Sequence, residues 1–169
     1  MISAFLSKLL TTRQASFTEK EIEIFDLNFS MQPLLSLVKF QNETKDGVMM
    51  GQLGYFVSEA IISHFKKRFA IEEQKMTNLW TNLFNISGLG KVQVVDITKE
   101  RTILKLENNN FARLYTKEYG IQKQPVCHLL AGIFKNFIEK TSGKKVECNE
   151  ISCIAMGNRV CTFELRPIR

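Results

Sequence analysis

The chain has 169 residues, a length suited to one domain whose apolar core needs no disulfide bonds for stability. Its composition, 44% hydrophobic and 24% charged with only 3 Pro and 9 Gly, excludes a disordered chain and a loop-rich secreted scaffold. The net charge of +6 comes from basic residues in short scattered groups, so nucleic-acid binding is not expected. No apolar run approaches the roughly 20 residues needed to cross a bilayer, and the first residues lack a signal-peptide cleavage site. We therefore expect a cytoplasmic protein without a membrane partner.

The N-terminal part of the chain predicts an amphipathic helix followed by an extended segment. Residues 1–10 are mostly apolar with one internal charge, which favours a short first helix. Apolar and polar residues alternate in places over 21–35, a pattern compatible with an extended arm or strand. No linker or repeat interrupts the sequence, so we predict a single domain, 1–169, with an N-terminal helix and arm over 1–45 and the main body over 46–169.

The main body begins with two predicted helices and a hairpin. From Asp46 to about Arg68, apolar residues recur at three- and four-residue steps, which is typical of a long helix packed on a sheet. A second helix is predicted over 71–85, before the Gly88-Leu89-Gly90 break. Residues 91–97 and 101–107 then read as two strands of an antiparallel hairpin, and Asn108-Asn109-Asn110 predicts a turn.

A second passage of helix and hairpin completes the chain. Pro125 is suited to an early helical position, and Gly143 is suited to a C-terminal stop. Two further strands are predicted near 145–151 and 160–165. The order of helices, hairpin, helix and hairpin predicts an α+β fold, in which helices pack on one face of an antiparallel sheet.

All four cysteines lie in the last quarter of the chain, and three of them share a plausible meeting point with a glutamate. Cys153 and Cys161 are symmetric about Gly157, which predicts a hairpin that sets them opposite each other. Cys127 is expected near a helix N-terminus, where the helix dipole favours a thiolate. Glu150 offers an oxygen as a fourth ligand, and three sulfurs with one carboxylate suit tetrahedral zinc. The spacing alone equally allows free buried thiols, and opposed cysteines also fit a disulfide.

The same region resembles a known family. The residues that carry the resemblance are Gln124-Pro125-Val126-Cys127-His128-Leu129-Leu130-Ala131-Gly132, followed by Val146, Glu150, Cys153, Ala155, Gly157, Cys161 and Phe163. This pattern, over about 104–165, is similar to the 4-vinyl reductase domain family. In related sensor domains of aromatic-responsive transcription activators the matching residues bind zinc, which implies a structural zinc ion on Cys127, Glu150, Cys153 and Cys161. The family is also similar in fold to subunits of the vesicle-tethering transport particle, which implies a homodimer.

The resemblance favours a small-molecule sensor or adaptor without enzymatic activity. Four protein ligands leave zinc no open position for a catalytic water. A hydrophobic or aromatic ligand is expected between sheet and helices, and the aromatic side chains predicted to contact it are Trp80, Phe84, Phe111 and Tyr115. Because no ATPase module or DNA-binding helix pair is recognisable, a protein signalling partner is expected to read the bound state.

Two other interpretations stay open. The family name suggests a reductase, or an accessory protein, of tetrapyrrole metabolism. A reductase needs a hydride source, and Gly88-Leu89-Gly90 leads into a strand instead of the helix of a dinucleotide fingerprint. The third interpretation is a scaffold that acts through its dimer surfaces. Cys148 is expected to be a buried thiol, while His64 and His128 are expected to be structural.

Overall fold

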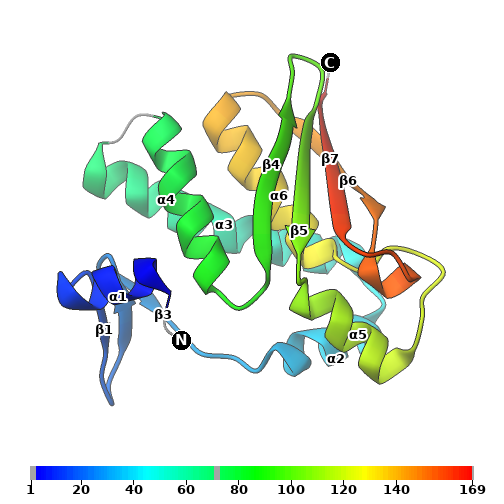
Figure 1. Cartoon of the computed structure of the whole chain (residues 1–169), viewed down its shortest axis with the longest axis horizontal. Helices are drawn as coiled ribbons and strands as arrows, with labels where there is room; N and C mark the ends of the chain where they lie inside the picture. Colours follow the sequence, from blue (N-terminus) through cyan, green and yellow to red (C-terminus); the bar gives the residue numbers. More distant parts are fainter. Residues whose placement is uncertain (1–2, 71–72, 169) are drawn as a thin grey trace. The chain divides into compact units, whose positions relative to one another are not determined.

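The predicted α+β fold class is confirmed by the computed structural model, which describes residues 3–70 and 73–168 (Figure 1). The described residues form six α-helices, a three-stranded sheet and a four-stranded sheet, both antiparallel. The chain divides into two compact units, Met1–Pro33 and Leu34–Arg169, whereas the division predicted from the sequence lies after residue 45. In the described part of the chain, no helix has the length and apolar character needed to span a membrane.

The first unit contains the predicted N-terminal helix and a small three-stranded meander. Ser3 caps the helix, because its Oγ accepts a hydrogen bond from the Leu6 N–H at 3.1 Å. Phe25 and Asp26 both have positive φ, as the two-residue turn between the last two strands requires. The elements are α1 (Ala4–Thr11), β1 (Ala15–Phe17), β2 (Ile22–Ile24) and β3 (Leu27–Phe29).

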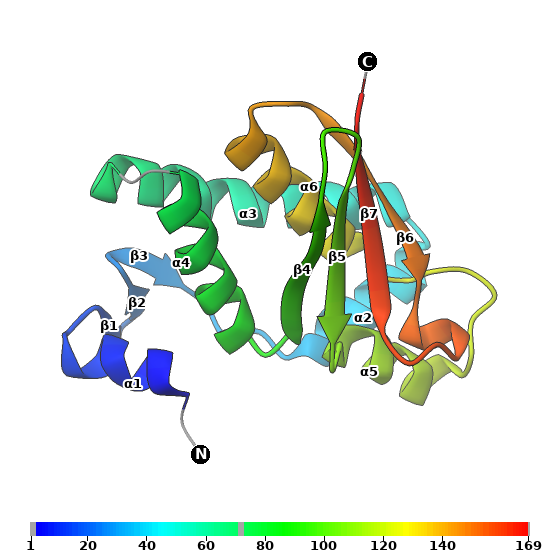
Figure 2. The same cartoon turned by 45° about the horizontal axis from the view of Figure 1, so that its top comes forward.

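The sheet of the second unit has the strand order β4-β5-β7-β6, so the two predicted hairpins join edge to edge (Figure 2). Strand β7 lies between β5 and β6, and its residues pair antiparallel with both. Strand β4 carries a bulge between Val94 and Asp96. The strands are β4 (Lys91–Ile97), β5 (Thr102–Glu107), β6 (Val146–Ser152) and β7 (Cys161–Pro167).

The long helix predicted from Asp46 is confirmed as α3, and the Asp46 carboxylate caps it by accepting the Met49 N–H at 2.8 Å. Helices α2 and α5 were not predicted from the sequence. The C-terminal helix begins at His128 instead of Pro125, because Cys127 is its N-cap. The helices are α2 (Leu34–Thr44), α3 (Gly47–Phe69), α4 (Glu73–Ile86), α5 (Asn110–Tyr119) and α6 (His128–Ser142), with a 3₁₀ turn η1 (Ile154–Met156).

The core of the second unit lies between the sheet and α6. Leu130, Phe134 and Phe137 of α6 are buried, as are the facing side chains of Leu104 and Phe163. Trp80 of α4 stacks on Phe137 with 3.8 Å between ring centroids, and Phe134 contacts Phe163 edge-on at 4.8 Å. These contacts fix α6, and with it the position of its N-terminus.

Helices α3 and α6 pack backbone against backbone at three glycines. A Cβ added at Gly54 would lie 1.9 Å from the carbonyl oxygen of Leu129. A Cβ added at Gly132 would lie 1.9 Å from the carbonyl oxygen of Gly51. Only residues without a side chain permit this approach, so the glycines determine how α3 seats against α6.

Polar groups align the same helix pair along its length. Glu59 of α3 accepts from Asn136 Nδ2 at 2.8 Å and lies 2.9 Å from Lys140 Nζ. These partners, Lys140 first, lower the pKa of Glu59 to about 2. Tyr55 adds a hydrogen bond from its hydroxyl to Glu139 Oε2 at 3.0 Å. The contacts therefore hold the two helices in one register.

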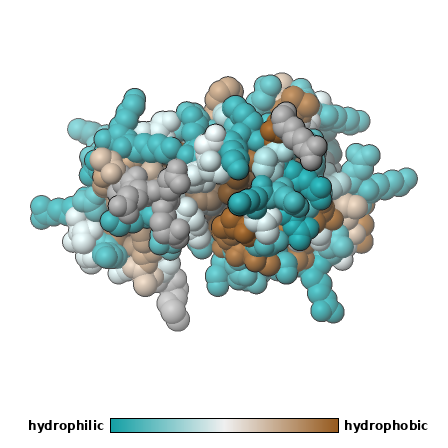
Figure 3. All heavy atoms as spheres, turned by 90° about the horizontal axis from the view of Figure 1, so that it is seen from above, coloured by the Kyte–Doolittle hydropathy of each residue, from teal (hydrophilic) through white to brown (hydrophobic). Residues whose placement is uncertain are grey.

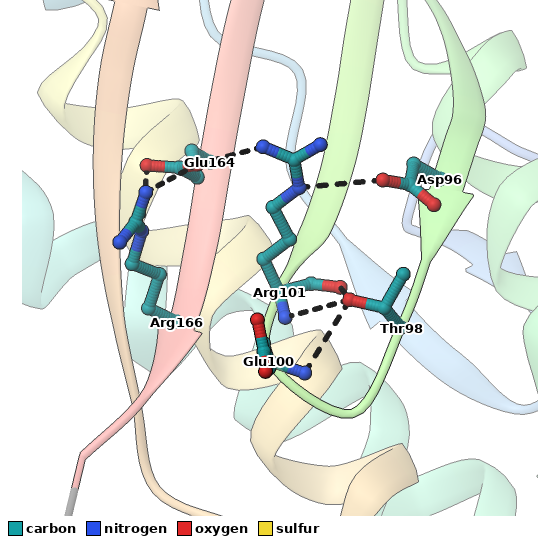
Figure 4. A network of polar contacts seen from close by, with 6 residues as sticks. All are labelled: Asp96, Thr98, Glu100, Arg101, Glu164 and Arg166. Carbon is teal, nitrogen blue, oxygen red and sulfur yellow. Dashed lines mark hydrogen bonds and ion pairs between the residues drawn. The ribbon is translucent and has the colours of Figure 1, made fainter.

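The sheet face away from the core is polar near the β4–β5 turn. Arg101 Nε lies 3.3 Å from Asp96 Oδ2, and its Nη1 lies 3.7 Å from Glu164 Oε1. Figure 4 shows Arg101 and Arg166 on either side of Glu164, and Arg166 Nε lies 2.9 Å from Glu164 Oε2. Elsewhere on the surface, hydrophobic side chains gather among hydrophilic ones on the face drawn in Figure 3.

Candidate metal centre

The four predicted metal ligands come from three segments that meet at one end of the sheet. Cys127 is the N-cap of α6, Glu150 lies in β6, Cys153 follows the end of β6, and Cys161 opens β7. All three sulfurs are buried, with at most 1% of each residue exposed. The packing of α6 on the sheet therefore brings Cys127 to the strands that carry the other three groups.

The ligand atoms of these residues, three Sγ and one carboxylate oxygen, all lie within 4.8 Å of one another. The Sγ of Cys127 is 3.8 Å from the Sγ of Cys153 and 3.8 Å from the Sγ of Cys161. A disulfide needs about 2.05 Å between its sulfurs, and all four cysteines of the chain are free. The disulfide that the spacing allowed is therefore not formed.

The sulfur spacing fits a tetrahedral metal. A tetrahedral centre with metal–sulfur bonds of about 2.3 Å holds its sulfurs about 3.8 Å apart. Glu150 supplies the fourth donor: its Oε2 accepts the backbone N–H of Cys127 at 3.0 Å, while its Oε1 is buried without a hydrogen-bond partner. A buried carboxylate oxygen without a partner is costly unless a cation or proton satisfies it. The residues present thus fit a metal ion.

The predicted hairpin geometry around Cys153 and Cys161 is wrong in its register. Ser152 pairs with Thr162, and Cys161 instead lies opposite Leu106 on β5. After β6 the chain makes the 3₁₀ turn η1, which ends at Gly157 with a φ of +89°. This turn places Cys153 outside the strand pairing, so that its sulfur points to Cys127 and not simply across a hairpin.

Asn109 is a residue of the centre that sequence reasoning missed, since Asn108-Asn109-Asn110 predicts only a turn. It is fully buried, and its Nδ2 donates to the Sγ of Cys127 at 3.1 Å and to the Sγ of Cys161 at 3.2 Å. Its Oδ1 accepts the Ala112 N–H at 3.1 Å and so caps α5. The only available sequence signal was a cap residue before a helix, and α5 itself was not predicted.

Replacing Asn109 with Asp is expected to weaken metal binding about 10- to 100-fold. The carboxylate retains the cap on Ala112, but it removes both N–H donors and adds a negative charge beside the sulfurs of Cys127 and Cys161. Competition with a chromophoric chelator measures the change in affinity. An unchanged affinity in a variant with native circular dichroism would contradict a role for Asn109 at the centre.

The charges of the metal-free cluster are set by burial and by the neighbouring sulfurs. Burial raises the pKa of Glu150 to about 8, and the Cys153 sulfur adds to the shift. Burial also raises the pKa of Cys127 well above its usual range. Hydrogen bonds from Cys127 and Cys161 lower the pKa of Cys153. The hydrogen bond from Cys127 acts in the same direction on Cys161, but the Cys153 contact and burial outweigh it and leave that pKa raised.

A single thiolate, stabilised by the other S–H groups, is therefore favoured before a cation binds. The remaining thiols and the carboxyl release their protons when the metal enters. The two remaining side chains of interest lie outside the ligand set. Cys148 is half-buried on β6, and His128 follows Cys127 with its imidazole against Gly47, whose added Cβ would lie 2.9 Å from the ring.

The four aromatic residues predicted to contact a ligand form two pairs. Trp80 and Phe84 of α4 stack on each other at 5.3 Å within the core beside α6. Phe111 and Tyr115 lie on α5 with 6.3 Å between ring centroids, and the Tyr115 hydroxyl donates to Asn42 Oδ1 at 3.2 Å. Tyr115 also lines an open cavity of about 600 Å³. The ligand role of these residues stays a prediction.

Solved structures of low sequence identity share this fold. The phenol-responsive sensory domain of the transcription activator PoxR, solved with phenol, has a TM-score of 0.78 at 18% identity, over 98% of this chain and 92% of that one. A vinyl-4-reductase family protein from Methanocaldococcus jannaschii has a TM-score of 0.58 at 16% identity, over 83% and 85%. A trafficking protein particle complex subunit 3 from Naegleria fowleri has a TM-score of 0.56 at 14% identity, over 80% and 91%.

Sequence comparison agrees with the structural likeness. A stretch of 45 residues is 38% identical to an uncharacterized protein of Methanocaldococcus jannaschii, and it covers 27% of this chain and 28% of that relative. Residues 103–167, which include all four candidate metal ligands, match the model of the vinyl-4-reductase domain. The resemblance to the 4-vinyl reductase domain family is thereby confirmed, and this chain carries a domain of that family over residues 103–167.

Proposed function

We propose that this chain is a zinc-containing sensor or adaptor domain that binds a hydrophobic or aromatic small molecule. One observation carries the proposal: three buried sulfurs and a carboxylate converge in a fold shared with a phenol-responsive sensory domain. The free cysteines suit a reducing compartment such as the cytoplasm. A site made of side chains supports a function better than a fold alone, because one fold serves many functions.

Zinc is the metal that this donor set favours. Three thiolates select a soft or borderline cation, and a carboxylate in the fourth position closes a tetrahedral site. Cys127, Glu150, Cys153 and Cys161 would hold the ion, which would tie the N-terminus of α6 to β6 and β7. With four protein ligands, the ion would brace the fold and leave catalysis without an open position.

Metal analysis tests the zinc assignment. Protein purified without added metal is expected to contain about one zinc per chain by mass spectrometry of the elements. Cys153→Ser is expected to lower the zinc content well below that, because serine is a poor zinc ligand at neutral pH. Cys148→Ser is the matched control, since Cys148 lies outside the cluster and is expected to leave the content unchanged. Metal-free protein in reducing buffer would contradict the assignment.

A thermal-shift titration with phenol tests the sensor function itself. Phenol is the compound solved with the PoxR sensory domain, and a protein that binds a ligand only when folded gains thermal stability with ligand concentration. We expect zinc-loaded protein to show such a gain with phenol or a related aromatic compound. If no member of an aromatic series changes the unfolding temperature, the small-molecule role is wrong.

A homodimer and a protein signalling partner complete the proposal. Helix α3 carries a run of exposed apolar side chains on the surface away from α6, and such faces are typical of protein interfaces. Its most exposed members are Val48 at 73% and Phe56 at 66%. The helix also includes exposed Met49, Leu53 and Val57. Because α3 packs tightly on α6, a contact on this face would be mechanically connected to the metal centre.

A further inference from the structure

A cavity of about 600 Å³ opens between the end of α2, helix α5 and the segment that leads into α6. Its volume is in the range of small-molecule sites. One wall is the segment 121–126, which ends directly before the metal ligand Cys127. The cavity therefore adjoins the metal centre without containing any of its ligands.

The wall of the cavity is held by specific hydrogen bonds. Gln41 of α2 is 5% exposed, and its Nε2 donates to the carbonyl of Val126 at 2.8 Å. The other end of its amide, Oε1, is buried without a hydrogen-bond partner. The Gln122 N–H donates to the carbonyl of Ala155 in η1 at 2.8 Å. The segment before Cys127 is thus tied to α2 on one side and to the turn after Cys153 on the other.

The side chains around this cavity have one sign of charge. Lys45 and Lys123 lie at its rim, and His128 lies beside them. None of the described residues that line it carries a carboxylate. Ile121 and Pro125 supply apolar surface next to these cations. A cavity with cations and apolar walls suits an anion that has an apolar body.

The core offers less space to a polar ligand than this cavity does. Trp80 and Phe137 stack at 3.8 Å between ring centroids, and Phe84 lies 5.4 Å from Phe134. Rings at these distances contact one another directly. A ligand that bears a charge would also lose its hydration there, whereas the cavity beside Tyr115 is open to water.

We propose that the cavity between α2, α5 and the segment 121–126 binds a small organic carboxylate with an aromatic or aliphatic body. The inference rests on the proposed small-molecule function and adds its place and its chemical class. Lys45 and Lys123 attract the carboxylate, while Ile121 and Pro125 contact the apolar body. Because the wall continues into Cys127, an occupied cavity stiffens the segment on which the metal ligand sits.

Calorimetric titration of the zinc-loaded full chain with sodium benzoate, and with benzyl alcohol as an uncharged partner of similar size, tests the proposal. Benzoate is expected to bind more tightly than benzyl alcohol and to weaken as salt is added. Lys45→Gln and Lys123→Gln are each expected to weaken benzoate binding about two- to fivefold, the effect of one exposed charge pair. Lys99→Gln, in the β4–β5 turn, is the matched control and is expected to bind as the unaltered chain does.

A second measurement locates the site independently of the variants. Benzoate is expected to shift the amide resonances of residues 121–126 and Gln41 in preference to those of the β4–β5 turn. Equal binding of both compounds, with no effect of either lysine variant, would overturn the carboxylate site and leave the sensor function standing. If neither compound binds and the aromatic series is also inert in the thermal-shift titration, the inference and the proposed function fall together.

Discussion

Replacing Gly54 or Gly132 with alanine is expected to lower the free energy of unfolding by about 2–4 kcal/mol. The new methyl group at either position would sit 1.9 Å from a carbonyl oxygen of the opposite helix, far inside contact distance. The obstacle is backbone in both cases, so α3 and α6 must separate as whole helices. Urea unfolding followed by circular dichroism measures the loss.

The direction of this effect is the reverse of the usual one. In a helix interior, alanine is favoured over glycine by about 0.8–1.0 kcal/mol. Gly51→Ala provides the control on the same helix, because its added Cβ would meet only the His128 carbonyl oxygen at an ordinary 3.7 Å. We expect Gly51→Ala to leave stability within about 1 kcal/mol of the unaltered chain. If Gly54→Ala were as stable as Gly51→Ala, the close helix contact would be contradicted.

Removing the metal is expected to have the largest effect, a loss of stability on the order of 5 kcal/mol. Without a cation, the buried carboxylate oxygen of Glu150 and the sulfurs of Cys127, Cys153 and Cys161 have no common partner. Thermal unfolding before and after treatment with a chelator, followed by addition of zinc, measures the loss and its recovery. Cys153→Ser protein is expected to show little response to the chelator, because it has little metal to lose.

The size of the metal effect is expected to grow as pH rises from about 6 to 8. The pKa of Glu150 is raised from 4.5 to about 8 in the metal-free protein, so its carboxyl stays protonated in the fold below pH 8. The unfolded chain ionises this carboxyl at the ordinary pKa, so the metal-free protein loses stability as pH rises from there to 8. Zinc competes with protons for the same groups, so its binding strengthens in the same range. A stability difference that shrinks with rising pH would contradict this account.

The same contacts connect the candidate centre with the surfaces proposed to act. Cys127 caps α6, α6 packs through Gly132 onto α3, and α3 presents the exposed side chains of Val48 and Phe56. Gln41 connects α2 to the residue before Cys127. A change at the metal segment can therefore reach the proposed dimer face through two helices whose backbones touch.

The sequence by itself was sufficient for the elements whose signals are local. The period of apolar residues and the Asp46 cap predicted α3, and alternation predicted the strands of both hairpins. The family resemblance identified the four candidate ligands, because their residue types and spacing are preserved as letters in the chain. Helix α5 escaped because its capping residue, Asn109, stands in a run of three asparagines that is typical of a turn.

Only the tertiary structure decided which distant groups meet, since contact between segments depends on packing that no local pattern encodes. It placed Asn109 on two sulfurs, set those sulfurs 3.8 Å from one another across three segments, and moved Cys153 off the strand register into a 3₁₀ turn. It also separated Trp80 in the core from Tyr115 at an open cavity, a distinction that depends on which face of a helix is covered. The glycines of α3 and α6 show the same physical reason: a missing side chain has meaning only where another backbone occupies the space.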